Sequence, residues 1–138
     1  MTQDITTLRQ RVEGLSGPDR ETDRQIALAC GGWTRAWSED VAAHKGGWYW
    51  KDVVADYSAT HEDTEHPPLY TASLDAALAL VERVRPGWRW AIGCREFDVY
   101  ECAFDHGDGT EQFLAENRPT PALALLAALL SSLEARGQ

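Results

Sequence analysis

Residues 120–133 read Thr-Pro-Ala-Leu-Ala-Leu-Leu-Ala-Ala-Leu-Leu-Ser-Ser-Leu, and no other stretch says as much about the fold. Threonine is a common helix N-cap and proline is favoured at the first helical position, so a helix is predicted to begin at Pro121. The run from Ala122 to Leu133 is almost wholly alanine and leucine. A helix that is apolar nearly all round must be buried on more than one side. It is therefore either a central core helix or half of a subunit interface.

A meander of antiparallel strands is predicted just before this helix. Every second residue from Trp88 to Ile92 is large and apolar, which is the period of a strand covered on one face. A second strand is predicted over about 97–104, where both faces carry apolar residues. The turn formers of residues 105–109 separate it from a short third strand at 111–114.

Three further helices are predicted upstream. Ser73 caps a helix that ends at Pro86-Gly87, and its apolar stripe falls at helical spacing. The stripe consists of Leu74, Ala77, Leu78 and Val81. An amphipathic helix is predicted over about 4–14, and a second over about 18–30 with Ser16 as its cap.

The intervening segment, at about 33–70, is rich in tryptophan and acidic residues and is interpreted as an insert. Trp33 and Trp37 are four apart, as one face of a helix requires. Residues 48–54 are typical of a short strand, and residues 52–66 of an acidic surface loop. In total, the order of elements predicts a single α+β domain over 1–138, with a small antiparallel sheet layered with helices in the manner of an α-β-α sandwich.

Composition narrows the class of partner. The 138 residues carry a formal charge of −9, which opposes direct binding to nucleic acid or an anionic membrane. The N-terminus shows no signal-peptide pattern, and the longest apolar stretch, 122–130, is shorter than the about 20 residues of a bilayer span. A cytoplasmic location is expected. Cys30, Cys94 and Cys102 form no metal-binding spacing and are predicted to be buried free thiols.

Three segments together resemble the phage ABA sandwich family. The first runs from Leu15-Ser16-Gly17-Pro18-Asp19-Arg20-Glu21 into Ile26-Ala27-Leu28-Ala29, the second from Pro67 to Ala77, and the third from Pro119 to Leu125. The resemblance implies a phage or prophage origin and a small sheet with helices on either side. It implies no activity. The segment from Trp33 to His66 is longer than expected for the family, so a function located there would belong to this member.

The aromatic and basic residues of the insert are a candidate ligand site, because aromatic rings stack on bases, sugars or partner side chains. The candidates are Trp33, Arg35, Trp37, His44, Lys45, Trp48 and Trp50. The alternative is that these rings form a small core that keeps the insert folded.

Residues 61–66, His-Glu-Asp-Thr-Glu-His, are a second candidate site, with His61, Glu65 and His66 as metal ligands. However, the two histidines are five residues apart and lead into prolines, whereas a zinc-binding helix places them four apart. A solvated acidic loop is the simpler explanation of the segment, because surface loops favour these residues. The sequence contains no GxSxG, GxGxxG or GxxxxGK[ST] motif, and no cofactor is expected.

Residues 95–116 hold seven carboxylates and one arginine. Such a run is either a solvated face or a negative surface that docks a basic protein partner. The candidate residues of the acidic face are Glu96, Asp98, Glu101, Asp105 and Asp108.

Three functions are therefore considered. The first is a non-enzymatic interaction protein of phage or prophage origin, which presents an acidic, tryptophan-bearing surface to an unidentified host or phage protein. Counter-defence is one role considered for it. The second is a sponge that binds a nucleotide-like molecule in the insert, and the third is a metal-dependent hydrolase. A homo-oligomer through the 121–135 helix is considered as well.

Overall fold

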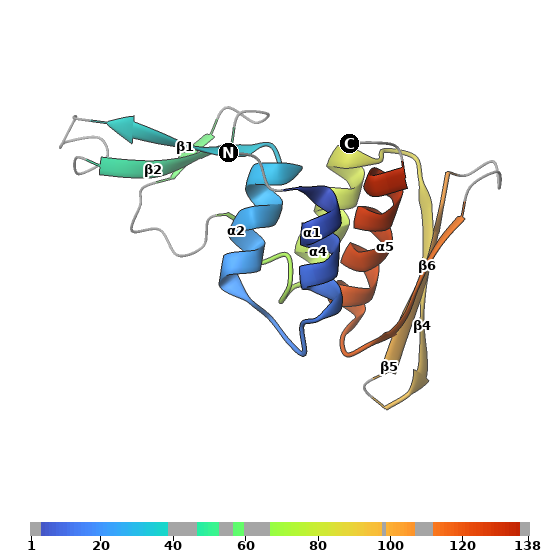
Figure 1. The fold of residues 1–138 in the computed structure, drawn as a ribbon. Coiled ribbons are helices and arrows are strands. Elements are labelled where there is room, and N and C mark those ends of the chain that lie inside the picture. The colour runs from blue at the N-terminus through green and yellow to red at the C-terminus, as the bar shows by residue number, and fades with distance from the viewer. Residues whose placement is uncertain are drawn as a thin grey trace.

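The computed structural model describes residues 4–38, 47–52, 57–59, 67–97, 99–106 and 112–135. Within these ranges the chain forms four helices and two three-stranded antiparallel sheets (Figure 1). In chain order the elements are α1 Ile5–Glu13, α2 Arg20–Ala29, β1 Trp33–Ser38, β2 Gly47–Asp52, β3 Tyr57–Ala59, α4 Leu74–Val84, β4 Arg89–Glu96, β5 Val99–Asp105, β6 Gln112–Arg118 and α5 Pro121–Ala135. The predicted α+β class is confirmed.

Helix α5 is the centre of the core. The backbone N–H of Leu123 donates to Oγ1 of Thr120 at 3.1 Å, so the helix begins where the sequence predicts. Its residues 122–130 are all buried, because α1, α4 and the β4–β5–β6 sheet pack around it (Figure 1). Of the two predicted alternatives, the central core helix is the one observed. One chain already covers these apolar side chains, so they do not favour a homo-oligomer through residues 121–135, which stays an untested prediction.

The first two helices are capped by aspartates. Asp4 accepts the N–H of Thr7 at the start of α1. Helix α2 begins later than predicted, because Asp19 rather than Ser16 is its cap and accepts the N–H of Thr22 at 3.0 Å. Asp19 has an extended backbone, with φ of −145°, which leaves the preceding Pro18 outside the helix.

Helix α4 and the β4–β5–β6 meander follow the prediction closely. Ser73 caps α4, although Leu80 is fully buried and Leu78 only half-buried. In the sheet Trp90 pairs with Phe104, so both point to the side of α5. Phe104 is completely buried, whereas Trp90 is 42% exposed, because α5 lies mainly over β5 and β6. The third strand is longer than predicted and contains a bulge near Asn117, whose φ is 59°.

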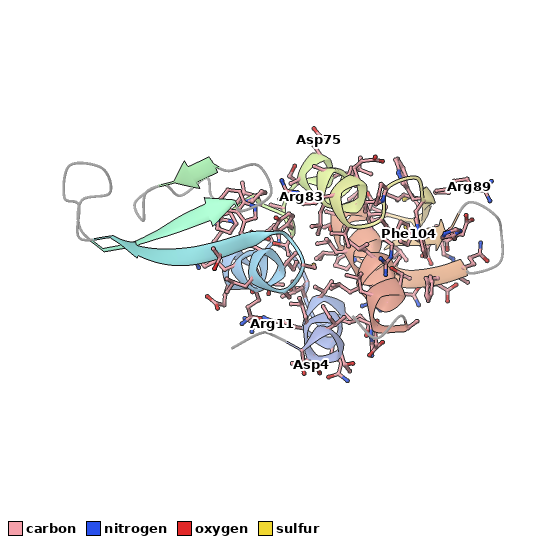
Figure 2. All side chains as sticks on the ribbon, turned by 90° about the horizontal axis from the view of Figure 1, so that it is seen from above. Asp4, Arg11, Asp75, Arg83, Arg89 and Phe104 are labelled. Carbon is pink, nitrogen blue, oxygen red and sulfur yellow. The ribbon has the colours of Figure 1, made fainter. Side chains whose placement is uncertain are left out.

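The two faces of this sheet have different surroundings. All four helices lie on one side of it in Figure 1. Phe104 on that side is completely buried, and Figure 2 places it among the side chains between the sheet and α5. No other described element covers the opposite side, which we call the outer face. The sequence predicts helices on both sides of the sheet. In the described parts of the chain, helices lie on one side.

The sheet β1–β2–β3 corrects the prediction for the insert. Trp33 and Trp37 lie on a strand, where they pair with Asp52 and Trp48 of β2, and not on one face of a helix. Residues four apart also share a face of a strand, because strand side chains alternate with a period of two. The spacing therefore fits both a helix and a strand, and pairing with β2 decides for the strand. Strand β3 lies within the segment predicted to be a loop. The sheet extends away from α2 in Figure 1.

Gly31 follows α2 at a point where the chain is too close to its neighbours for a side chain. A Cβ atom there would lie 2.7 Å from Oη of Tyr70 and 2.8 Å from Cα of Ala27. We expect Gly31→Ala to lower the free energy of unfolding by about 2 kcal/mol, because the backbone of α2 must shift. Gly17→Ala is the matched control, since nothing lies within 4 Å of its Cβ position. Urea unfolding of the two variants checks this, and equal losses would contradict it.

Candidate functional site

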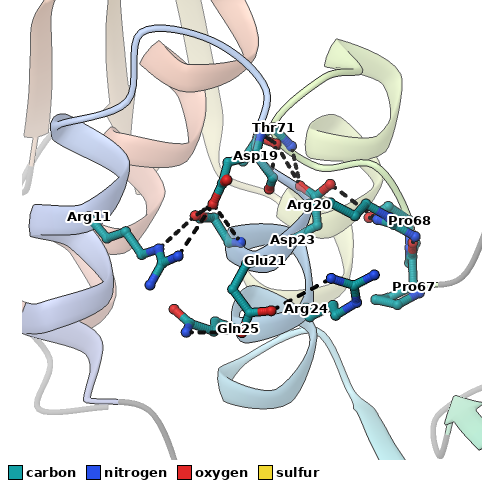
Figure 3. Close-up of polar contacts among 11 residues, drawn as sticks. Arg11, Asp19, Arg20, Glu21, Asp23, Arg24, Gln25, Pro67, Pro68 and Thr71 are labelled. Atoms are coloured by element: carbon teal, nitrogen blue, oxygen red, sulfur yellow. Dashed lines mark hydrogen bonds and ion pairs between the residues drawn. The ribbon is translucent and has the colours of Figure 1, made fainter.

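A buried polar cluster joins the start of α2 to the segment that leads into α4 (Figure 3). Asp23 is 1% exposed, and its Oδ1 accepts the N–H of Thr71 at 2.7 Å and the Thr71 hydroxyl at 2.8 Å. Its Oδ2 accepts from Arg20 at 3.1 Å. Arg20 also donates to the carbonyl oxygens of Pro67 and Pro68. These polar groups form hydrogen bonds with one another, so the cluster has a structural role. It holds the end of the insert against α2.

Asp19 extends this cluster toward α1. Its carboxylate accepts a hydrogen bond from the Thr22 hydroxyl and lies 3.5 Å from the guanidinium of Arg11. The hydrogen bond from Thr22, together with the Arg11 charge, holds the pKa of Asp19 below its usual value, although partial burial acts in the opposite direction.

This shift predicts how the free energy of unfolding depends on pH. Because its pKa is lowered on folding, Asp19 stabilises the folded state above its unfolded pKa of about 4, and the contribution is lost as the pH falls through the folded value. Asp19→Asn keeps a capping oxygen but has no charge to lose. Wild type and variant are expected to differ more at about pH 7 than at about pH 2. Urea unfolding at both pH values checks this; a pH-independent difference would contradict it.

The candidate ligand site in the insert is described only in part. Trp33 is 6% exposed and belongs to the core, so its ring is not available to a ligand at the surface. The other six candidates, Arg35, Trp37, His44, Lys45, Trp48 and Trp50, have side chains outside the described residues. A cavity of about 100 Å³ lies between Trp33, Tyr70 and Arg83. It is smaller than the about 300 Å³ at which small-molecule pockets begin, so it does not favour a nucleotide-like ligand.

The candidate metal site lies outside the described residues, since His61, Glu65 and His66 all fall between 60 and 66. In the part of the chain that the structure describes, no group of three or more His, Cys, Asp or Glu side chains could hold a metal ion.

None of the helices described is long and apolar enough to cross a membrane.

The thiols are free in the structure. Cys102 is buried and Cys30 half-buried, and burial raises the pKa of each thiol to about 12. The prediction of a buried thiol is wrong for Cys94, which is exposed because α5 lies mainly over β5 and β6 and leaves the end of β4 uncovered. Its Sγ donates to the carbonyl oxygen of Glu96 at 2.9 Å.

The outer face of the β4–β5–β6 sheet has an apolar hollow of about 340 Å³. Its floor consists of the small residues Ala91, Gly93 and Ala103, which are brought side by side by the strand register. Leu114 of β6 pairs with Ala103 and is 61% exposed at the side of the hollow. An exposed leucine beside small apolar residues on a sheet face is typical of a surface that another element covers.

Carboxylates flank this hollow. Glu101 lies over Gly93, with its Oε2 atom 3.8 Å from the position of a Cβ there. Its Oε1 atom lies 3.7 Å from Nε of Arg95. Glu116 is exposed on the neighbouring strand, and its carboxylate forms no ion pair or hydrogen bond with the described residues. Arg89, which is exposed, forms an ion pair with the partly buried Asp105 at one end of the face, where Figure 2 shows Arg89 pointing away from the helices.

The candidate acidic face is thus brought together in part. Glu101 and Asp105 lie on the outer face, and Glu96 is exposed where β4 ends. Asp98 and Asp108 lie outside the described residues. Sequence reasoning missed Glu116 and the hollow. The signal was present in the strand alternation, because Ala91 and Gly93 occupy the positions of β4 that face away from Trp90 and Ile92.

Phe97 directly follows β4, in the turn to β5. It is 90% exposed, the most exposed of the large apolar side chains described. Single exposed apolar residues are ordinary on protein surfaces, so Phe97 alone does not define a site.

Comparisons with protein-family models, with curated proteins and with solved structures find no match to this chain. The resemblance to the phage ABA sandwich family stays a prediction.

Proposed function

We propose that this chain is a non-enzymatic interaction protein that binds another protein through the outer face of its β4–β5–β6 sheet. The observation that carries the proposal is the exposed hollow with Leu114 at its side. Polar residues at this surface serve as flanks to an apolar floor, which is how protein interfaces are composed. In contrast, the buried cluster of Arg20, Asp23 and Thr71 consists of groups that hydrogen-bond one another.

The resemblance to a phage family supports a more specific form of the proposal. If the chain is phage- or prophage-encoded, its partner is a host or phage protein in the bacterial cell, and a component of host defence fits the role. The formal charge of −9 supports a protein partner over nucleic acid, since polyanions repel each other.

Site-specific photo-crosslinking tests the proposal. A benzophenone amino acid is introduced in place of Leu114 on the outer face or, as the control, in place of Leu69, an exposed leucine in the segment before α4. After irradiation in a bacterial lysate, we expect one discrete crosslinked protein from position 114 and not from position 69. The same products from both positions, or none from position 114, would refute binding through this face.

A further inference from the structure

The outer face has the features of a surface that accepts a helix. Sheets are covered by helices or by other sheets, and helices lie on sheet faces, whereas added strands join sheet edges. The floor of the hollow consists of Ala91, Gly93 and Ala103, so a covering element can approach the backbone of the sheet closely. The opposite face of the same sheet already shows this arrangement, because α5 lies along it (Figure 1).

The charges flanking the hollow select the kind of helix. Glu101 and Glu116 stand on adjacent strands beside the hollow, and Glu116 has no cationic partner among the described residues. Arg95 lies 3.7 Å from Glu101, and both side chains are about half-exposed, so this ion pair is weak. Arg95 therefore competes only weakly with an incoming cation for Glu101. A helix with an apolar stripe flanked by lysine or arginine would fill the hollow and pair with both carboxylates.

The same charges argue against a second copy of this chain. Face-to-face pairing of two outer faces would bring Glu101 and Glu116 of both copies together, and each copy carries a formal charge of −9. Like charges brought together at an interface weaken it.

We propose that the outer-face hollow, with Glu101 and Glu116 beside it, binds a cationic amphipathic helix of the partner protein. The helix lies across β4, β5 and β6, with a bulky apolar side chain in the hollow and basic side chains beside the two carboxylates. This inference rests on the proposed function and adds the chemistry of the partner to it.

A model peptide tests the inference without knowledge of the partner. The probe is a fluorescein-labelled helix of leucine and lysine, about five turns long, with its leucines on one face. A leucine and glutamate peptide of the same pattern is its counterpart. Fluorescence anisotropy is expected to show that the lysine peptide binds and that the glutamate peptide does not. Equal binding of both peptides, or no binding of the lysine peptide, would overturn the inference.

Paired variants distinguish the site from general attraction to an acidic protein. Glu101→Gln with Glu116→Gln is expected to weaken binding of the lysine peptide at least about tenfold. The matched control, Glu21→Gln with Glu82→Gln, removes the same charge from exposed positions on α2 and α4 and is expected to change binding by no more than about twofold. Equal weakening by the two pairs would overturn the site.

Filling the hollow gives an independent readout. Ala103→Trp keeps every charge and places a large side chain on the uncovered face, so it is expected to weaken peptide binding at least about tenfold while the circular dichroism spectrum is retained. If light scattering shows that the wild-type protein is a dimer and that Ala103→Trp is a monomer, the outer face binds a second copy and the inference is overturned. If position 114 crosslinks a discrete protein but the lysine peptide does not bind, the inference fails and the proposed function stands.

Discussion

Leu126→Ala is expected to lower the free energy of unfolding by about 3 kcal/mol, which is a large share of the stability of a domain of this size. Leu126 is completely buried in the middle of α5, where the helix packs against α1, α4 and the sheet. Neighbours on several sides cannot collapse together into the space left by the side chain. The substitution therefore loses both the transfer free energy and the contacts across the cavity.

Leu114→Ala is the matched control for this substitution. It removes the same atoms from a side chain that is 61% exposed on the outer face. Its effect on the free energy of unfolding is expected to remain within about 0.5 kcal/mol. Urea denaturation of the two variants, monitored by tryptophan fluorescence, provides the comparison. Equal losses would contradict the position of α5 at the centre of the core.

Asp23→Ala is expected to cost about 3 kcal/mol, for a different physical reason. The substitution leaves the N–H and the hydroxyl of Thr71 without their acceptor and removes the carboxylate partner of Arg20. Polar groups that lose their partners inside a protein retain the cost of having left water. The attachment of the insert to α2 should loosen as a consequence.

Two further variants separate this cause from a general effect of losing an acidic residue. Asp75→Ala removes an exposed carboxylate from the first turn of α4 and is expected to cost no more than about 0.5 kcal/mol. In a double-mutant cycle, Arg20→Ala combined with Asp23→Ala should cost clearly less than the sum of the single losses, since the two side chains interact directly. Strict additivity would contradict the pairing.

The two structural predictions bear on the proposed function because they concern separate parts of the molecule. Leu126 is completely buried in α5, whereas Glu101, Glu116 and Leu114 line the hollow on the outer face of the sheet. Variants of the outer face can therefore test binding with little change in folding. That separation makes the peptide experiment interpretable.

Local signals in the sequence account for much of the fold. Thr120 and Ser73 cap the helices that they were predicted to cap, since capping depends on a side chain and a backbone N–H three residues away. The alternation from Trp88 to Ile92 also acts over a short range, and it predicted which side of β4 points toward the helices. It did not predict that Trp90 would be 42% exposed, because that depends on where α5 lies over the sheet. The prediction for Trp33 and Trp37 failed because their spacing fits both a helix and a strand, and pairing with a distant segment decided it.

The candidate site shows the same division. The sequence by itself determined that residues 95–116 are acidic, that β4 alternates small with large residues, and that α5 must be buried. Only the tertiary structure decided that α5 is buried within its own chain, that Asp23 meets Thr71, and that Glu101 and Glu116 stand beside one hollow. Periodicity and capping act within a few residues of chain, whereas burial and the meeting of distant side chains depend on how whole elements pack.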